Sequence, residues 1–230
     1  MLTPDQAIDQ ILSTQTAAGA FNAQVHLQHR TDNDANACVT GLVLRALRPV
    51  LERANSACPL TPASKRALAF LASCESPTLP GAFRFWPATA QPSWIQDLPD
   101  DADDTAICAL ELVRYNQRPI AFLREIACRV LIKRRLSKVD RPAPEWLRPG
   151  VFVTWLRDEP RPNVVDCCVN ANVAALLAFA DLRHLPGYAE ACEMIDHAVA
   201  WTGTSRLRAQ CISPFYPDPA ELLYAVDHAV

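Results

Sequence analysis

Three polar residues recur at equal intervals along the chain, and this spacing constrains the fold more than any other feature. Asn36, Asp101 and Asp166 lie 65 residues apart (101 − 36 and 166 − 101). Each is followed four positions later by a residue with a small polar side chain, namely Thr40, Thr105 or Asn170. Equal intervals of this length indicate internal repeats. A repeat of two helices buries its apolar stripe only against its neighbours, so the sequence predicts a stack of helical hairpins.

Each repeat is predicted to hold two helices joined by a Gly-x-Phe loop, because apolar residues recur at helical spacing on both sides of that loop. The loops are residues 19–21, 81–83 and 150–152. The first helices cover about 3–15, beginning at a Thr-Pro-Asp-Gln capping box, then 62–74 and 120–136. The second helices cover about 36–51, 103–115 and 170–180. A fourth unit has a helix at 187–201, a short connection at 213–217 and a helix at 220–230.

These elements predict an all-α chain that forms a single helical-repeat domain over residues 1–230. The repeats cover about 1–55, 60–118, 119–183 and 187–230. The 19 prolines, against only 6 glycines, cluster between the apolar stretches, so they mark stiff connections between helices.

Charge and cysteine usage restrict the partners and the compartment. A formal net charge of -3 offers no basic field for a polyphosphate backbone, so we expect no nucleic-acid partner. The basic run at 133–135 is interpreted as a solvated helix C-terminus, with a peripheral contact to an anionic membrane as the alternative. Residues 1–6 lack the features of a secretory signal, and no apolar run is long enough to cross a bilayer. Nine cysteines without a C-x-x-C pair fit a reducing compartment, so we expect a cytoplasmic protein.

Two motifs resemble those of a known family. The segment Leu12-x-x-Gln15-x-x-x-Gly19-x-Phe21 resembles a glutamine/aromatic repeat, and Asp101-Ala102-Asp103-Asp104-Thr105-Ala106 matches an Asp-x-Asp-Asp-Thr-Ala motif. Both are similar to motifs of the terpenoid cyclase/protein prenyltransferase α/α-toroid family, closest to squalene-hopene cyclase-like class II terpene cyclases. The resemblance implies an α/α toroid, or a partial (open) toroid, with the second helices as its inner layer. It also implies protonation-initiated cyclisation of an apolar isoprenoid without a cofactor, with the acid at Asp103.

The acidic motif suits a general acid, because protonating a double bond requires a carboxyl group that stays protonated until the substrate is in place. Asp101 and Asp104 flank Asp103. Like-charge repulsion in a poorly hydrated pocket would raise the pKa of one of the three. A helix N-terminus opposes this, because its dipole favours the carboxylate. The other interpretation of the same residues is an acidic N-cap and first turn.

Further side chains are candidates for substrate binding. Asn170 and Asn172 are two amides inside an apolar helix, which favours a hydrogen-bonding role. Aromatic side chains could line an apolar pocket and stabilise a carbocation, or belong to the core. The aromatic candidates are Phe83, Phe85, Trp86, Trp94 and, in the fourth connection, Tyr216.

Two metal sites are alternatives to a cofactor-free acid. Asp100, Asp101 and Asp104 offer hard oxygen ligands for Mg²⁺, as in a Mg-dependent isoprenoid diphosphate enzyme. A second set imitates the Asp-x-Cys and His ligands of Zn²⁺ in the protein-prenyltransferase branch, and consists of Asp166, Cys168 and His228.

The competing class of function is a non-catalytic helical-repeat scaffold or binding protein, in which a homodimer could cover the open end of the stack. The two classes differ in the surroundings of Asp103. A cyclase requires Asp103 to point into a deep apolar cavity, whereas a scaffold places it in solvent as part of a helix cap.

Overall fold

The computed structural model of the chain describes residues 3–54, 61–95, 98–140, 142–157, 163–216 and 218–229. This part of the chain is mostly helical and contains one small two-stranded sheet. The α-helices are α1 (Pro4–Ser13), α2 (Ala37–Ala54), α3 (Pro62–Ser73), α4 (Ala102–Arg114), α5 (Ile120–Ile126), α6 (Cys167–Phe179), α7 (Tyr188–Thr202), α8 (Arg206–Ile212) and α9 (Pro219–Ala229).

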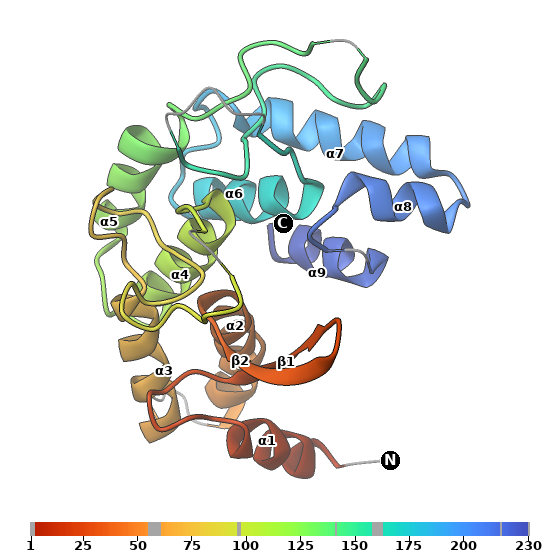
Figure 1. The fold of residues 1–230 in the computed structure, drawn as a ribbon. Helices are drawn as coiled ribbons and strands as arrows, with labels where there is room; N and C mark the ends of the chain where they lie inside the picture. Colours follow the sequence, from red (N-terminus) through yellow and green to blue (C-terminus); the bar gives the residue numbers. More distant parts are fainter. Residues whose placement is uncertain are drawn as a thin grey trace.

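The helices follow a curved path with an inner and an outer row (Figure 1). Helix α2 packs on α4, α4 on α6, and α6 on α9, which forms the inner row. Helices α3, α5 and α7 lie on the outer side of this row, each against an inner helix. Side chains from α2, α4, α6 and α9 can therefore meet on the inner side of the curve.

Side-chain caps fix where several helices begin. Thr3 and Gln6 form the predicted capping box at α1: the Thr3 hydroxyl accepts from the Gln6 backbone N–H at 3.3 Å, and the Gln6 side chain accepts from Thr3 N–H at 2.9 Å. Thr61 caps α3 by accepting from Ser64 N–H at 3.1 Å, ahead of a proline at the first helical position. Such caps satisfy N–H groups that have no partner within the helix.

The three Gly-x-Phe loops share one set of hydrogen bonds. In each, the Phe backbone N–H donates to a side chain in the first turn of the next inner helix, at 3.1, 2.9 and 2.9 Å. That side chain donates in turn to the carbonyl oxygen at the helix start, at 2.7, 2.6 and 2.9 Å. The three sets are Phe21–Thr40–Asn36, Phe83–Thr105–Asp101 and Phe152–Asn170–Asp166. Only a side chain that both accepts and donates fits this position, which explains why threonine and asparagine recur there.

The loop glycines are needed for their backbone conformation. Gly19, Gly81 and Gly150 have φ of +100°, +85° and +91°, a region that other residues rarely adopt. At Gly19 a Cβ atom would also lie 2.3 Å from the Arg66 carbonyl oxygen. The phenylalanines that follow are fully buried, so each loop anchors its hairpin in the core.

Replacing Thr105 by valine is expected to lower the free energy of unfolding by about 1–3 kcal/mol, because the buried Phe83 N–H loses its acceptor. Valine keeps the size of the side chain, so a packing loss does not obscure the result. Urea denaturation measures the change. The matched control is Thr14→Val, at an exposed hydroxyl bonded only to the carbonyl of Ile11, which should change the free energy by less than about 0.5 kcal/mol. Equal effects of the two substitutions would contradict the role given to Thr105.

The connection between α1 and α2, which was predicted as a Gly-x-Phe loop, also contains a β-hairpin. Strands β1 (Asn22–Leu27) and β2 (Arg30–Ala35) pair antiparallel, with Leu27 opposite Arg30. In β1 the exposed residues Gln24 and His26 alternate with the half-buried residues Ala23, Val25 and Leu27, which is the period of a strand. The all-α prediction therefore missed a small sheet.

Two further differences concern the helices. The predicted helix at 120–136 ends early: α5 passes into a π-helical turn (Ala127–Leu131) closed by Ile132 N–H to the Ala127 carbonyl at 3.0 Å. The chain then pairs Leu136 N–H with the carbonyl of Val151 at 2.8 Å, which a continuing helix would prevent. Helix α8, which follows α7 after Gly203, was not predicted.

Candidate functional site

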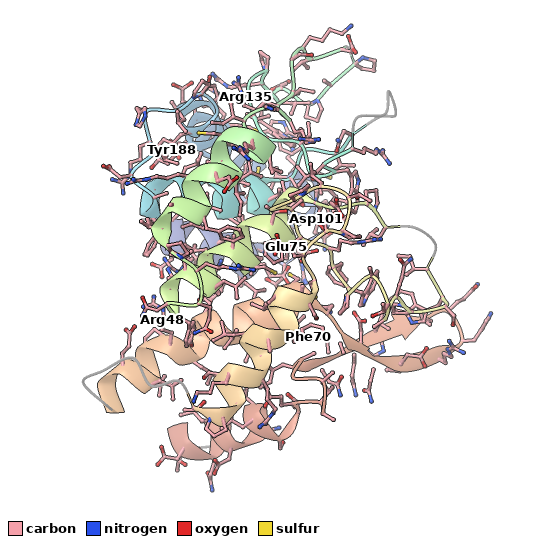
Figure 2. All side chains as sticks on the ribbon, turned by 90° about the vertical axis from the view of Figure 1, so that its left-hand side faces the viewer. Arg48, Phe70, Glu75, Asp101, Arg135 and Tyr188 are labelled. Carbon is pink, nitrogen blue, oxygen red and sulfur yellow. The ribbon has the colours of Figure 1, made fainter. Side chains whose placement is uncertain are left out.

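The acidic motif begins helix α4 at a junction of three segments. Asp101 is the N-cap, and its Oδ1 accepts from Asp104 N–H at 2.7 Å. Its backbone forms bridges to Phe83 and Trp155, and Phe83 bridges on to Glu75. In Figure 2 Glu75 and Asp101 are labelled close together in the middle of the molecule. The interpretation of Asp101 as an N-cap is confirmed, although the cap is buried and not solvated.

Asp103 is buried, at 6% relative exposure, and each of its oxygens accepts a side-chain hydrogen bond. The Asn172 Nδ2 of α6 donates to Oδ1 at 2.8 Å, and the Tyr216 hydroxyl donates to Oδ2. Burial raises the pKa of Asp103, while the bonds from Tyr216 and Asn172 and the charge of Arg45 lower it. Burial prevails, so the pKa of Asp103 lies above its ordinary value.

Besides burial, like-charge crowding within the motif raises the pKa values of Asp101 and Asp104. Burial raises the pKa of Asp101 to about 7 and that of Asp104 well above its ordinary value, and the charge of Asp103 adds to both shifts. Among the described residues no side chain donates a hydrogen bond to the Asp104 carboxyl group, and the neighbouring Asp101 carboxyl group raises its pKa further. Asp104 is therefore a buried acid that is stable only when protonated.

Replacing Asp104 by asparagine is expected to raise the free energy of unfolding at pH 8 by about 1–3 kcal/mol. An unfolded aspartate loses its proton near pH 4, whereas burial lets folded Asp104 and Asp101 keep theirs to higher pH. Stability therefore falls as the pH rises from about 4 through the folded-state pKa values, and the substitution flattens this fall.

Urea denaturation at pH 5 and pH 8 measures both effects. The matched control is Asp140→Asn, whose side chain is 79% exposed and whose replacement should change stability little at either pH. A lower stability of the Asp104→Asn variant at pH 8 would contradict the assignment of a protonated acid.

A cavity of about 300 Å³ lies beside Asp103, where α2, α6 and α9 meet. Both hydrogen-bond partners of Asp103, Asn172 and Tyr216, line it, while Asp103 itself lies one side chain behind the wall. The remaining lining residues are Leu42, Arg45, Cys168, Asp218, Ala220, Glu221, Tyr224 and Ala225. Asp103 thus has neither of the two expected surroundings: it is buried and not in solvent, yet it contacts the cavity only through its partners.

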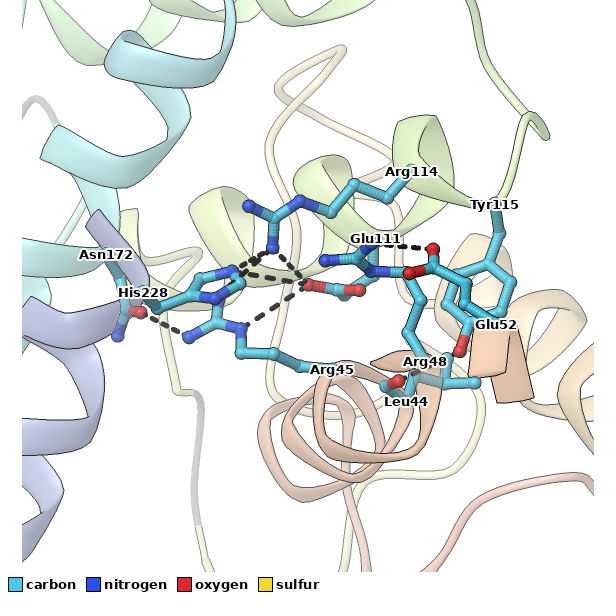
Figure 3. Close-up of polar contacts among 9 residues, drawn as sticks. All are labelled: Leu44, Arg45, Arg48, Glu52, Glu111, Arg114, Tyr115, Asn172 and His228. Carbon is cyan, nitrogen blue, oxygen red and sulfur yellow. Dashed lines mark hydrogen bonds and ion pairs between the residues drawn. The ribbon is translucent and has the colours of Figure 1, made fainter. Parts of the chain in front are cut away.

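A charged network continues from Asn172 across the inner helices (Figure 3). Arg45 of α2 donates from Nη1 to Asn172 Oδ1 at 2.9 Å and from Nε to Glu111 Oε1 of α4 at 3.4 Å. Arg114 also donates to Glu111 Oε1 at 3.4 Å, and His228 of α9 accepts from Arg114. The side chains of Arg45 and Glu111 are only 2% and 0% exposed, so this pair is shielded from water.

His228 takes part in this network as a neutral group. Burial, with the charges of Arg45, Arg114 and Arg48, lowers its pKa to about 3. A neutral ring nitrogen accepts from the Arg114 guanidinium, which agrees with the contact between them. The approach of His228 to Glu111 at 3.8 Å is therefore no ion pair at neutral pH.

The other predicted binding residues lie away from this cavity. Phe83 belongs to the core, where its ring meets that of Phe122, and Asn170 bonds to the backbone of Phe152. Phe85, Trp86 and Trp94 form a separate edge-to-face cluster beside the β-hairpin. The indole N–H of Trp86 donates to Asp34 Oδ1 at 2.7 Å. Of the predicted binding residues, Asn172 and Tyr216 are the two that line the cavity.

The two predicted metal sets are engaged in other contacts. Among the described residues no group of three or more carboxylate, thiol or imidazole side chains could hold one ion. In the magnesium set, Asp100 accepts from Ser76 at 2.6 Å while Asp101 caps α4. In the zinc set, Asp166 caps α6 and accepts from Phe215 N–H at 3.1 Å, whereas His228 contacts Arg114.

Sequence reasoning missed Arg45, Glu111 and Cys38. Cys38 Sγ lies 3.3 Å from the Tyr216 hydroxyl and so borders the same group. The available signal was a single charge at an apolar position, with Arg45 between Leu44 and Leu47 and Glu111 inside the apolar stretch of α4. A charge in such a position requires a buried partner.

Comparisons of the chain with family models, curated proteins and solved structures give no match. None of the helices in the described ranges combines the length and the apolar character that a membrane crossing requires.

Proposed function

We propose that the chain is a class II terpene cyclase-like enzyme, in which Asp103 protonates a double bond of an isoprenoid held in the cavity between α2, α6 and α9. The observation that carries the proposal is the burial of the Asp103 carboxyl against two side chains, Asn172 and Tyr216, that line this cavity. Burial disfavours the carboxylate and raises the pKa of Asp103, which favours the protonated form that a general acid requires.

The proton passes from Asp103 Oδ2 to Tyr216 Oη, and the hydroxyl proton of Tyr216 passes to the double bond. Tyr216 fits this step because it touches both the carboxyl group and the cavity. The double bond supplies the electron pair for the new C–H bond and becomes a carbocation, which a second double bond attacks. The cyclic cation then loses a proton to water, and Asp103 takes up a proton from solvent through Tyr216, so the reaction is an isomerisation without redox change.

The size of the cavity limits the substrate. About 300 Å³ is at the lower end of the roughly 300–1,000 Å³ of ligand pockets, which favours a short isoprenoid over one of squalene length. Leu42, Ala225 and the ring of Tyr224 provide apolar contacts, and Asp218 and Glu221 lie on the exposed side. The proposal includes the finer architecture, an open partial toroid of hairpin repeats, supported by the inner row of helices and the recurring loop bonds.

The test is incubation of the purified protein with isoprenoids of several lengths in H₂O and in D₂O, with gas chromatography and mass spectrometry of the extracts. An acid whose proton exchanges with solvent places one deuterium in each product molecule formed in D₂O. A cyclic product with one deuterium is the expected result. Absence of any cyclic product, or a product without deuterium, would refute protonation by the chain.

A non-catalytic role as a binding protein for an apolar ligand is the second candidate. It is favoured by one observation: both oxygens of Asp103 are already engaged by Asn172 and Tyr216, as in a purely structural buried carboxyl group. The same incubation separates the two, because a binding protein returns the isoprenoid unchanged.

A further inference from the structure

Arg45 holds the amide of Asn172 in one of its two orientations. The guanidinium group only donates hydrogen bonds, so the Asn172 atom that faces its Nη1 at 2.9 Å must be the amide oxygen. The Nδ2 group of Asn172 is then turned toward Asp103 Oδ1, to which it donates at 2.8 Å. Glu111 Oε1 holds the other edge of Arg45 by accepting from Nε at 3.4 Å.

The orientation of this amide decides which oxygen of Asp103 can carry a proton. An oxygen that accepts from an N–H group cannot present its own proton along the same line, so Oδ1 is the carbonyl oxygen of the neutral acid. The proton is left on Oδ2, because the Tyr216 hydroxyl, which donates to the carboxylate, can rotate and accept from Oδ2–H when the acid is neutral. If the amide were turned, its oxygen would accept a hydrogen bond from a protonated Oδ1, and the proton would then lie on the side away from Tyr216.

We propose that Arg45 is a positioning residue: it fixes the Asn172 amide and thereby places the acidic proton of Asp103 on Oδ2, facing Tyr216. The inference rests on the proposed function, because a proton on Oδ2 matters only if the acid is used. Three inner helices supply the parts, with Arg45 on α2, Glu111 and Asp103 on α4, and Asn172 on α6. Figure 3 shows Arg45 between Glu111 and Asn172.

The Asp103 surroundings contain other charged or titratable groups, none of which substitutes for this contact. They are Cys38 of α2, Asp101 and Asp104 at the start of α4, Asp166 and Cys168 at the start of α6, and Tyr216. Of these, Tyr216 is hydrogen-bonded to the Asp103 carboxyl group, and it engages the oxygen opposite the one that Asn172 engages.

Infrared spectroscopy of the protonated carboxyl group tests the inference without a substrate. The C=O band of Asp103 is assigned by carbon-13 labelling of aspartate and by its loss in Asp103→Asn. All variants carry Tyr216→Phe, so that Asn172 is the one remaining donor to the carboxyl group. A hydrogen bond to the carbonyl oxygen lowers the frequency of this band, and adding Asn172→Leu gives the frequency without any donor.

Arg45→Met with Glu111→Gln removes both charges of the pair, which avoids leaving either one buried alone. We expect the C=O band to move to higher frequency, toward that of the Asn172→Leu reference, because the freed amide turns its oxygen to the acid. Arg48→Met is the control: Arg48 lies on the same helix but pairs with Glu52 at 2.8 Å, so the band should stay.

A band that stays in place after the double substitution overturns the positioning role. Should that variant fail to fold, Arg45→Gln serves instead, because a glutamine amide can present either a donor or an acceptor and no longer dictates the orientation of Asn172. With Tyr216 intact, the double variant should also lower kcat on the order of 10²-fold, a larger effect than any change in KM from the loss of Arg45 at the cavity wall. If the wild-type protein forms no product, the proposed function is refuted, but the role of Arg45 is not. That role is still tested by the position of the C=O band.

Discussion

Replacing Asp103 by asparagine is expected to slow product formation by about 10²- to 10⁴-fold, the usual contribution of a positioned general acid. Asparagine has nearly the same size and keeps polar atoms opposite Asn172 and Tyr216, but it has no acidic proton to deliver. The initial rate of cyclic product, determined by gas chromatography and mass spectrometry, measures the effect. Thermal unfolding of the same samples shows whether the variant is folded.

The control for this substitution is Asp140→Asn, which makes the same chemical change at a side chain that is 79% exposed. Its rate should equal that of the wild type. An Asp103→Asn variant that is folded and retains the wild-type rate would exclude Asp103 as the acid, while leaving the fold and the polar network unaffected.

Replacing Glu111 by glutamine is expected to lower the free energy of unfolding by about 3–5 kcal/mol, the largest stability effect that we predict. The substitution leaves the Arg45 guanidinium, whose side chain is 2% exposed, without a counter-charge in the interior. Arg114, which contacts the same oxygen, loses its partner charge as well. Urea denaturation at neutral pH gives the free energy.

Removing the opposite charge as well should recover most of this loss. The double variant Arg45→Met with Glu111→Gln has neither charge of this ion pair in the interior. It should therefore be more stable than Glu111→Gln alone. A double variant as unstable as the single one would mean that the ion pair is not the cause of the loss. The result also shows whether the double variant is suitable for the infrared test of Arg45.

Two of the helices that begin at the equally spaced polar residues could be predicted well because their determinants are local. The predicted helix at about 103–115 corresponds to α4 (Ala102–Arg114), and that at 170–180 to α6 (Cys167–Phe179). Asp101 and Asp166 cap these helices through their own side chains, and such caps are recognisable in a sequence. The role of Thr105 and Asn170 could not be predicted from the sequence. Each side chain accepts a hydrogen bond from the backbone of a loop about 20 residues earlier in the chain.

The candidate site was predictable only in part, because its parts come from distant segments. Asp103 and Asn172 were both identified, but their contact joins residues 69 positions apart. Arg45 is 127 positions from Asn172, and a single charge in an apolar helix gives no indication of which residue it meets. Tyr216 was also identified, but it reaches Asp103 from the connection between α8 and α9, and α8 was not predicted.

The titration of the Asp103 carboxyl carbon by carbon-13 NMR tests the central claim most directly. The signal is assigned by its loss in Asp103→Asn and is followed between pH 2 and 10 in the wild-type protein. The account predicts a pKa above the ordinary aspartate value of about 3.9, because burial outweighs the bonds from Tyr216 and Asn172 and the charge of Arg45. A pKa at or below that value would mean that Asp103 is a permanent carboxylate, and it would contradict the proposed acid.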